Sequence, residues 1–375
     1  MNFKKFFIFL FICLVAFAKS QSQEQNSYYI ENYQIQQADT GILYLQIDNT
    51  NFIKNNEYFG DIAEGYTLLG FNIAPKLVYS PSSKIKWSAG GNFLSYYGRE
   101  NEVEARLLLS FQYKIYPNLD LILGNIYGTV NHRMIEPLLE FERYLDKNVE
   151  NGIQFLWKSD RIFADLWLNW EQQILQGDPY QEKFNVGLSS DFLIVDQDNY
   201  RILIPFQNIV QHIGGQINSN NDEPLTTIFN NATGVKLAKL VNQKFIKKFI
   251  LSSYIVNYQD LSPQKRQLFI DGTASYTTLD LMNDYFDLSL GYWYGEQYIA
   301  PLGNPLFESY SRTKFYVEEP IRQLAIAKLS YHKEVIKNTD LGIRIEGFYD
   351  IPAGTTDYTW AIIVVFNEKF FLKKF

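Results

Sequence analysis

The chain has 375 residues, with 34 Lys and Arg against 41 Asp and Glu, which gives a formal net charge of −7. That acidity removes any reason to expect a nucleic-acid partner, because phosphate binding needs a basic surface. After the N-terminal apolar segment, no run approaches the ~20 apolar residues of a membrane-spanning helix, which excludes a helical membrane protein. The mean hydropathy of −0.20 still allows a transmembrane β-barrel, because the residues that face its interior are polar.

The N-terminus has the parts of a secretory signal peptide. Lys4 and Lys5 precede an apolar run over residues 6–17, and a small-residue cleavage site ends at Ala18. The run is shorter than the ~20 residues that span a bilayer, which argues against an anchoring helix. Cleavage would remove Cys13, the only cysteine. We expect three segments: a signal peptide at 1–18, a short flexible lead at 19–39 and a transmembrane barrel at 40–375.

Residues 103–127 show a strand pattern that recurs along the chain. Alternate positions from Ala105 to Ile115 are apolar, and most of the positions between them are polar or charged. Because successive side chains of a strand point to opposite faces, this segment has one apolar and one polar face. The first strand is about 14 residues long, whereas a tilted strand needs only ~9–11 to cross a bilayer.

The same pattern predicts 16 strands, near 40–48, 64–79, 85–97, 103–116, 119–127, 150–158, 161–174, 183–195, 200–210, 226–241, 248–258, 265–281, 285–298, 322–336, 340–350 and 357–367. Seven connections are short, around Ser82, Asn118, Ser159, Asp198, Gln243, Asn283 and Asn338. Eight are generally longer, near 49–63, 98–102, 128–149, 175–182, 211–225, 259–264, 299–321 and 351–356. Short and long connections alternate, as in outer-membrane barrels. We predict an all-β fold: a transmembrane antiparallel up-and-down β-barrel with both ends at the periplasmic rim.

The alternation also predicts which side chains face lipid. One face carries apolar sets on four strands: Ile85, Trp87, Ala89, Gly91 and Phe93; Ile162, Ala164, Leu166, Leu168 and Trp170; Phe286, Leu288, Leu290, Tyr292 and Tyr294; Leu341, Ile343, Ile345, Gly347 and Tyr349. A charge at mid-bilayer costs on the order of 2–4 kcal/mol, so the charged positions must face a wet lumen. These are Lys86, Arg106, Lys114, Asp165, Glu171, Asp271, Asp287, Arg344 and Glu346. The alternative is that they form the solvated face of a soluble sheet.

Over residues 40–375 the chain resembles Gram-negative outer-membrane β-barrels of the porin-like type. The last strand ends in aromatic residues, and Phe366, Phe370 and Phe375 are each candidates for the terminal signal by which such barrels are recognised. The resemblance implies an outer-membrane location after export by the signal peptide. It implies three partners: outer-membrane lipid, the barrel-assembly machinery through the C-terminal aromatic strand, and a small hydrophilic solute.

The connection at residues 128–149 is charged, and Leu138, Phe141 and Leu145 have the spacing of a short amphipathic helix. In porins the connection after strand 5 enters the lumen, so the resemblance implies a constriction loop; a surface loop over the rim is the alternative. The pore candidates are Arg133, Glu136, Glu140, Glu142 and Arg143 in this connection and Arg106, Asp165, Glu171, Arg344 and Glu346 on strands. Because three of the loop residues are glutamates and two are arginines, we expect a modest preference for cations.

Local signals for catalysis are absent from the sequence. The three histidines, His132, His212 and His332, have no G-x-S-x-G or HExxH context and form no ligand cluster. We therefore expect no enzyme activity, no catalytic residue, no metal and no cofactor. The expected function is a porin-like channel for passive or substrate-selective passage of small hydrophilic solutes. The alternatives are a non-conducting barrel for assembly, export or surface attachment, and an outer-membrane hydrolase that depends on His132 or His212.

Overall fold

The computed structural model describes residues 26–375 except 100–101, 216–222, 242, 244 and 315. The predicted signal peptide therefore lies outside the described residues. The strands are β1 (Ile42–Glu57), β2 (Tyr66–Ser82), β3 (Ile85–Tyr96), β4 (Val103–Tyr116), β5 (Leu119–Ile126), β6 (Glu150–Lys158), β7 (Ile162–Gln172), β8 (Glu182–Asp196), β9 (Tyr200–Gly214), β10 (Thr226–Leu240), β11 (Lys248–Asp260), β12 (Asp271–Met282), β13 (Phe286–Glu296), β14 (Ile321–Ile336), β15 (Thr339–Asp350) and β16 (Thr355–Lys374).

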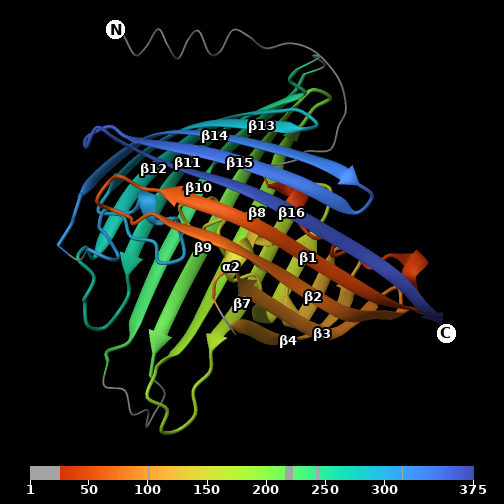
Figure 1. Ribbon diagram of the computed structural model, residues 1–375. Helices are drawn as coiled ribbons and strands as arrows, with labels where there is room; N and C mark the ends of the chain where they lie inside the picture. Colours follow the sequence, from red (N-terminus) through yellow and green to blue (C-terminus); the bar gives the residue numbers. More distant parts are fainter. Residues whose placement is uncertain (1–25, 100–101, 216–222, 242, 244, 315) are drawn as a thin grey trace.

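Each strand pairs antiparallel with its sequence neighbours, and β1 pairs with β16 to close the barrel (Figure 1). This confirms the predicted fold of 16 strands. Long connections, such as 127–149 and 297–320, lie at one rim, and short turns, such as 83–84 and 337–338, lie at the other rim with the start of β1 and the end of β16. Because outer-membrane barrels carry their long loops outside the cell, the long connections mark the extracellular rim.

The two closing strands are longer than the sequence predicts. In β1, Asn49, Asn51 and Asn55 resemble turn residues, but they face outward and bond to one another or to neighbours, as between Asn51 Nδ2 and Asn49 Oδ1 at 2.5 Å. In β16 the strand continues through the charged residues after Phe366, because residues 369–374 pair with the start of β1. Phe375 then donates its N–H to the Gly41 carbonyl at 2.7 Å, at the seam of the barrel.

Exposure follows the predicted parity on most strands. Leu109 and Leu290 are 52% and 45% exposed, whereas the inward-facing Asp165 and Arg344 are 0% and 3% exposed. Asp271 departs from the prediction: it begins β12 on the outward parity, because Gly272, Ala274 and Tyr276 hold the inward positions. Arg106 is also exposed, near the extracellular rim, where it pairs with Glu104.

Three segments of the chain fill much of the lumen. They are residues 26–40, the connection 127–149 with the short helices η3 (Thr129–His132) and α2 (Arg143–Asp146), and the connection 297–320 with η4 (Pro305–Phe307). Figure 1 shows α2 within the ring of strands. Inward aromatic residues pack with these segments in one apolar cluster, which includes Trp167, Trp293, Tyr298, Phe307 and Phe348. Within the described chain, no helix is long and apolar enough to cross a membrane.

The segment 26–40 differs from the expected flexible lead. Two short turns, η1 (Ser27–Tyr29) and η2 (Gln37–Asp39), frame it. Tyr29 and Tyr33 are both 6% exposed, and Gln112 on the inner face of β4 donates to the Tyr33 carbonyl at 2.8 Å. Its tyrosines therefore pack on the barrel interior, although its polar composition suggests disorder.

Candidate functional site

The connection 127–149, hereafter the plug loop, occupies the lumen beside the inner wall. This is the position predicted for it rather than the surface alternative. Its apolar residues Leu138, Phe141 and Leu145 are buried, and Phe141 contacts Tyr29 of the N-terminal segment with ring centroids 5.3 Å apart. The amphipathic pattern therefore serves to pack the loop inside the barrel.

His132 fixes the first turn of the plug loop to the wall. Its Nδ1 lies 2.7 Å from Asp165 Oδ2, and its Nε2 lies 3.2 Å from Glu150 Oε2. The ring stacks on Trp167 at 3.5 Å between centroids and is fully buried. Burial alone would lower the pKa of His132, but the two carboxylates outweigh burial and raise the pKa to about 9. Because both nitrogens are engaged, this imidazole has a structural rather than a catalytic geometry.

Charged contacts tie the rest of the plug loop to strands on opposite sides of the barrel. Glu136 pairs with Lys328 on β14, and Glu142 pairs with Lys54 on β1. Arg143 Nη2 contacts Glu171 Oε1 on β7 at 3.0 Å. The two glutamates are thus neutralised by lysines, which removes most of the physical basis for the expected cation preference.

The candidate residues on β15 belong to the same network. Arg344 pairs with Glu346, and its guanidinium lies 3.7 Å from the centre of the Phe141 ring. Lys328 Nζ is 3.9 Å from Glu346 Oε2 and so links this pair to Glu136. The structure therefore brings nine of the ten predicted pore residues to the plug loop or the wall beside it. Arg106 instead pairs with Glu104 near the rim and reaches the plug loop only at its last residue, through the Val149 carbonyl at 3.4 Å.

Glu140 differs from the other plug-loop carboxylates. Its backbone N–H donates to the Leu302 carbonyl at 2.9 Å, and its side chain borders a cavity. Burial, with the negative charge of Glu142 added, raises the pKa of Glu140 to about 7. This carboxyl changes charge near neutral pH.

The second filling segment, 297–320, was not singled out from the sequence. The Tyr298 hydroxyl donates to the Pro137 carbonyl at 2.9 Å, and Asn304 Nδ2 donates to Glu136 Oε1 at 3.0 Å. Arg312 Nη2 donates to the Ala300 carbonyl at 2.8 Å and thereby braces the segment against itself. Its length and its Pro-Leu-Gly-Asn-Pro run over residues 301–305 were the available signals.

A different arrangement lies on the outward face near the extracellular rim. His212 is directly opposite Thr227 across the β9–β10 pair, and its Nδ1 is 2.9 Å from Thr227 Oγ1. Trp170, Phe184 and His212 occupy facing positions on β7, β8 and β9, and their rings stack in a row, with centroids 5.0 and 4.9 Å apart. Within the described residues this is the one histidine bonded to a hydroxyl.

The ninth strand predicted from the sequence ends at residue 210, which leaves His212 in a loop, so the pair was not foreseen. The strand reaches Gly214, so the parity rule places His212 outward, between the inward-facing Gln211 and Ile213. The third histidine, His332, faces the lumen near the periplasmic rim and stacks on Tyr28 at 4.0 Å. Among the described residues, no group of three or more His, Cys, Asp or Glu is placed to hold a metal ion.

The closed barrel, the separation of long loops and short turns onto opposite rims, and the apolar outer face define an outer-membrane β-barrel of the porin-like type. Solved structures similar to it include a loop L8 deletion mutant of OmpT, an outer membrane protein of Vibrio cholerae (11% identity, 88% of this chain and 100% of that chain, TM-score 0.52). In-vitro folded OmpT in its trimer form is also similar (8%, 87% and 100%, 0.51), as is an anion-selective porin from Comamonas acidovorans (10%, 87% and 98%, 0.50). At these identities the likeness concerns the fold alone.

The family model for the lipid A 3'-O-deacylase type matches residues 35–375, which includes every strand. The chain belongs to this family. No curated protein matches the chain.

The expectation that the chain is not an enzyme is wrong, because its family is that of a deacylase. The expectation rested on the absence of local catalytic motifs. In a barrel, groups that lie side by side come from different strands, as His212 and Thr227 do from β9 and β10, and no local motif records them.

Proposed function

We propose that the chain is an outer-membrane hydrolase that removes an ester-linked acyl chain from a lipid of the lipid A class in the outer leaflet. The family match over residues 35–375 carries this proposal. The filled lumen supports it, because a barrel whose interior is packed with Trp167, Trp293 and Phe307 is poorly suited to free diffusion. Export by the signal peptide remains a prediction.

We place the chemistry at His212 and Thr227. Both side chains are half-buried on the outward face where β9 and β10 approach the extracellular rim, at the depth of outer-leaflet headgroups. The row of Trp170 and Phe184 beside His212 offers an apolar, aromatic surface against which an acyl chain can lie.

The proposed step uses the contact between His212 Nδ1 and Thr227 Oγ1. His212 takes the hydroxyl proton while Oγ1 attacks the acyl carbonyl carbon. The ester C–O bond breaks, and the leaving sugar oxygen takes the proton from the imidazolium. Water then hydrolyses the acyl-threonine and releases the fatty acid. Gly214 leaves room at the other edge of the ring, since a Cβ at Gly214 would lie 2.5 Å from His212 Nε2.

The test is release of free fatty acid from purified lipid A in mixed detergent micelles, measured by mass spectrometry with the full refolded chain. The proposal expects time-dependent release of ester-linked chains only. A correctly folded barrel that releases no fatty acid would overturn it.

Passage of small hydrophilic solutes is a second candidate, favoured by one observation. A polar cavity remains between the plug loop and the wall formed by β10, β11 and β12, and it reaches side chains such as Lys236, Ser252 and Thr278. Conductance of the purified barrel decides whether this space is continuous.

A further inference from the structure

Arg133 has an unusual backbone at the end of η3. Its φ of 54° and ψ of 31° lie in the left-handed region, which non-glycine residues seldom adopt. The backbone is held there from both sides: its N–H donates to the Val130 carbonyl at 3.1 Å, and its carbonyl accepts from Gln207 Nε2 at 3.1 Å. Such strained positions cluster at ligand-holding sites.

The side chain of Arg133 lies against the inner wall. The guanidinium lies 3.9 Å from the centre of the Phe163 ring on β7. Its Nε is buried without a hydrogen-bond partner in the described part of the chain, and no described carboxylate pairs with it. The plug loop's other arginine, Arg143, and the lysines that meet the loop, Lys54 and Lys328, each have a carboxylate partner. A guanidinium has five donors and no acceptor, so a half-buried one without an acceptor is incompletely satisfied.

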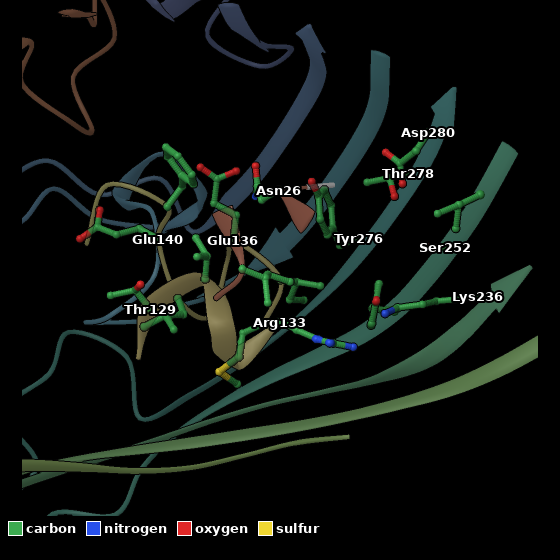
Figure 2. Close-up of a pocket in the computed structure, with 18 of the residues that line it drawn as sticks. Asn26, Thr129, Arg133, Glu136, Glu140, Lys236, Ser252, Tyr276, Thr278 and Asp280 are labelled. Atoms are coloured by element: carbon green, nitrogen blue, oxygen red, sulfur yellow. The ribbon is translucent and has the colours of Figure 1, made fainter. Parts of the chain in front are cut away.

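Arg133 borders a cavity of about 130 Å³. In Figure 2 the side chains of Arg133 and Lys236 enter this space from opposite sides, one from the plug loop and one from β10. The hydroxyls of Ser252 on β11 and Thr278 on β12 line the same wall. A cavity of about 150 Å³ in another protein holds a benzene molecule, so this space admits a ligand of several heavy atoms.

The carboxylates that line the cavity do not compensate Arg133. Glu136 pairs with Lys328, and in Figure 2 the Glu140 carboxylate points away from the guanidinium, while Asp280 lies beside Thr278 on β12. Lys236 is paired with Asp191, with 3.0 Å between Nζ and Oδ1. Arg133 is therefore the positive charge at this cavity that has no carboxylate partner among the described residues.

We propose that this cavity is a binding site for a small oxyanion, held by the Arg133 guanidinium with a hydroxyl contact from Ser252. Guanidinium donors match the planar pair of oxygens of a carboxylate and the oxygens of phosphate. The site lies in the lumen, apart from the outward pair of His212 and Thr227, and so does not depend on the proposed hydrolysis.

Calorimetric titration of the full chain in detergent with inorganic phosphate, and separately with acetate, tests the proposal. We expect saturable binding of at least one anion, and the better of the two identifies its class. Arg133→Gln should weaken binding at least tenfold, and Arg133→Lys should retain part of it. Arg106→Gln removes an arginine that is paired and exposed at the rim, and it should bind like the wild type.

Ser252→Asp gives an independent answer if Arg133→Gln does not assemble, because it places a carboxylate opposite Arg133 without touching the loop. It should abolish anion binding while the barrel folds. Absence of saturable binding of either anion to the wild type, or equal affinities for wild type and Arg133→Gln, would overturn the proposal. Undiminished binding by Ser252→Asp would overturn it as well.

Discussion

His132 Nδ1 lies 2.7 Å from Asp165 Oδ2, and this contact joins the plug loop to β7 in the interior of the barrel. Glu150 on β6 holds the other nitrogen of the same ring. A loop fixed in this way cannot leave the lumen unless it separates buried charges. The filled interior is therefore a stable part of the fold.

Asp165→Asn should destabilise the barrel. Removing one partner of a buried ion pair costs about 3–5 kcal/mol where the remaining charge is uncompensated. Here Glu150 still faces the His132 ring, so we expect a smaller loss. The matched control is Glu104→Gln, which breaks the exposed pair with Arg106 and should cost less than about 1 kcal/mol. The urea concentration at half-unfolding is measured for both variants from the gel mobility of unheated samples. Equal midpoints would contradict a structural role for the pair of His132 and Asp165.

The same contact predicts a pH dependence. The pKa of His132 is raised from its ordinary 6.5 to about 9, because Asp165 and Glu150 outweigh the effect of burial. The protonated imidazole therefore contributes stability that is fully present below about pH 6.5 and is lost as the pH rises through 9. Thermal midpoints in detergent should fall between pH 6.5 and 9.5 for the wild type. His132→Asn should lack this component of the fall; if both proteins fall equally, the imidazole does not carry the charge.

The plug loop predicts low conductance. In planar bilayers the wild type should conduct far less than an open barrel of 16 strands, and deletion of residues 138–146 should raise conductance, because it removes the buried Leu138, Phe141 and Leu145. Unheated gel mobility shows whether the deleted protein is assembled. An assembled deletion variant with unchanged conductance would mean that the loop is not the obstruction.

Two adjacent serines on β11 point to opposite faces of the barrel wall. Ser253 is exposed on the outer face, whereas Ser252 lines the cavity that contains Arg133. Ser253→Asp places a charge against hydrocarbon and should lower the assembly yield, although by less than the ~2–4 kcal/mol of a mid-bilayer Lys or Arg. Ser252→Asp should assemble like the wild type because Arg133 and Lys236 lie near it. Equal yields would show that the register is shifted.

The alternation of apolar and polar residues was sufficient to predict the barrel, because lipid imposes a strict period of two on every strand. The position of the plug loop in the lumen was implied by the resemblance to porins, in which the connection after strand 5 enters the lumen, and not by the alternation. Three features escaped it. The N-terminal segment packs through isolated tyrosines such as Tyr29, the segment 297–320 folds without periodicity, and His212 meets Thr227 only through strand register.

The hydrolase account is tested most directly by fatty-acid release from lipid A with single variants at the outer face. His212→Asn should lower the rate by about 10²-fold or more, the usual contribution of a general base, and Thr227→Ala should do the same while Thr227→Ser retains activity. His332→Asn, a lumen histidine at the opposite rim, serves as the control and should keep the wild-type rate. Wild-type rates in both His212→Asn and Thr227→Ala, in barrels shown to be folded, would contradict the account.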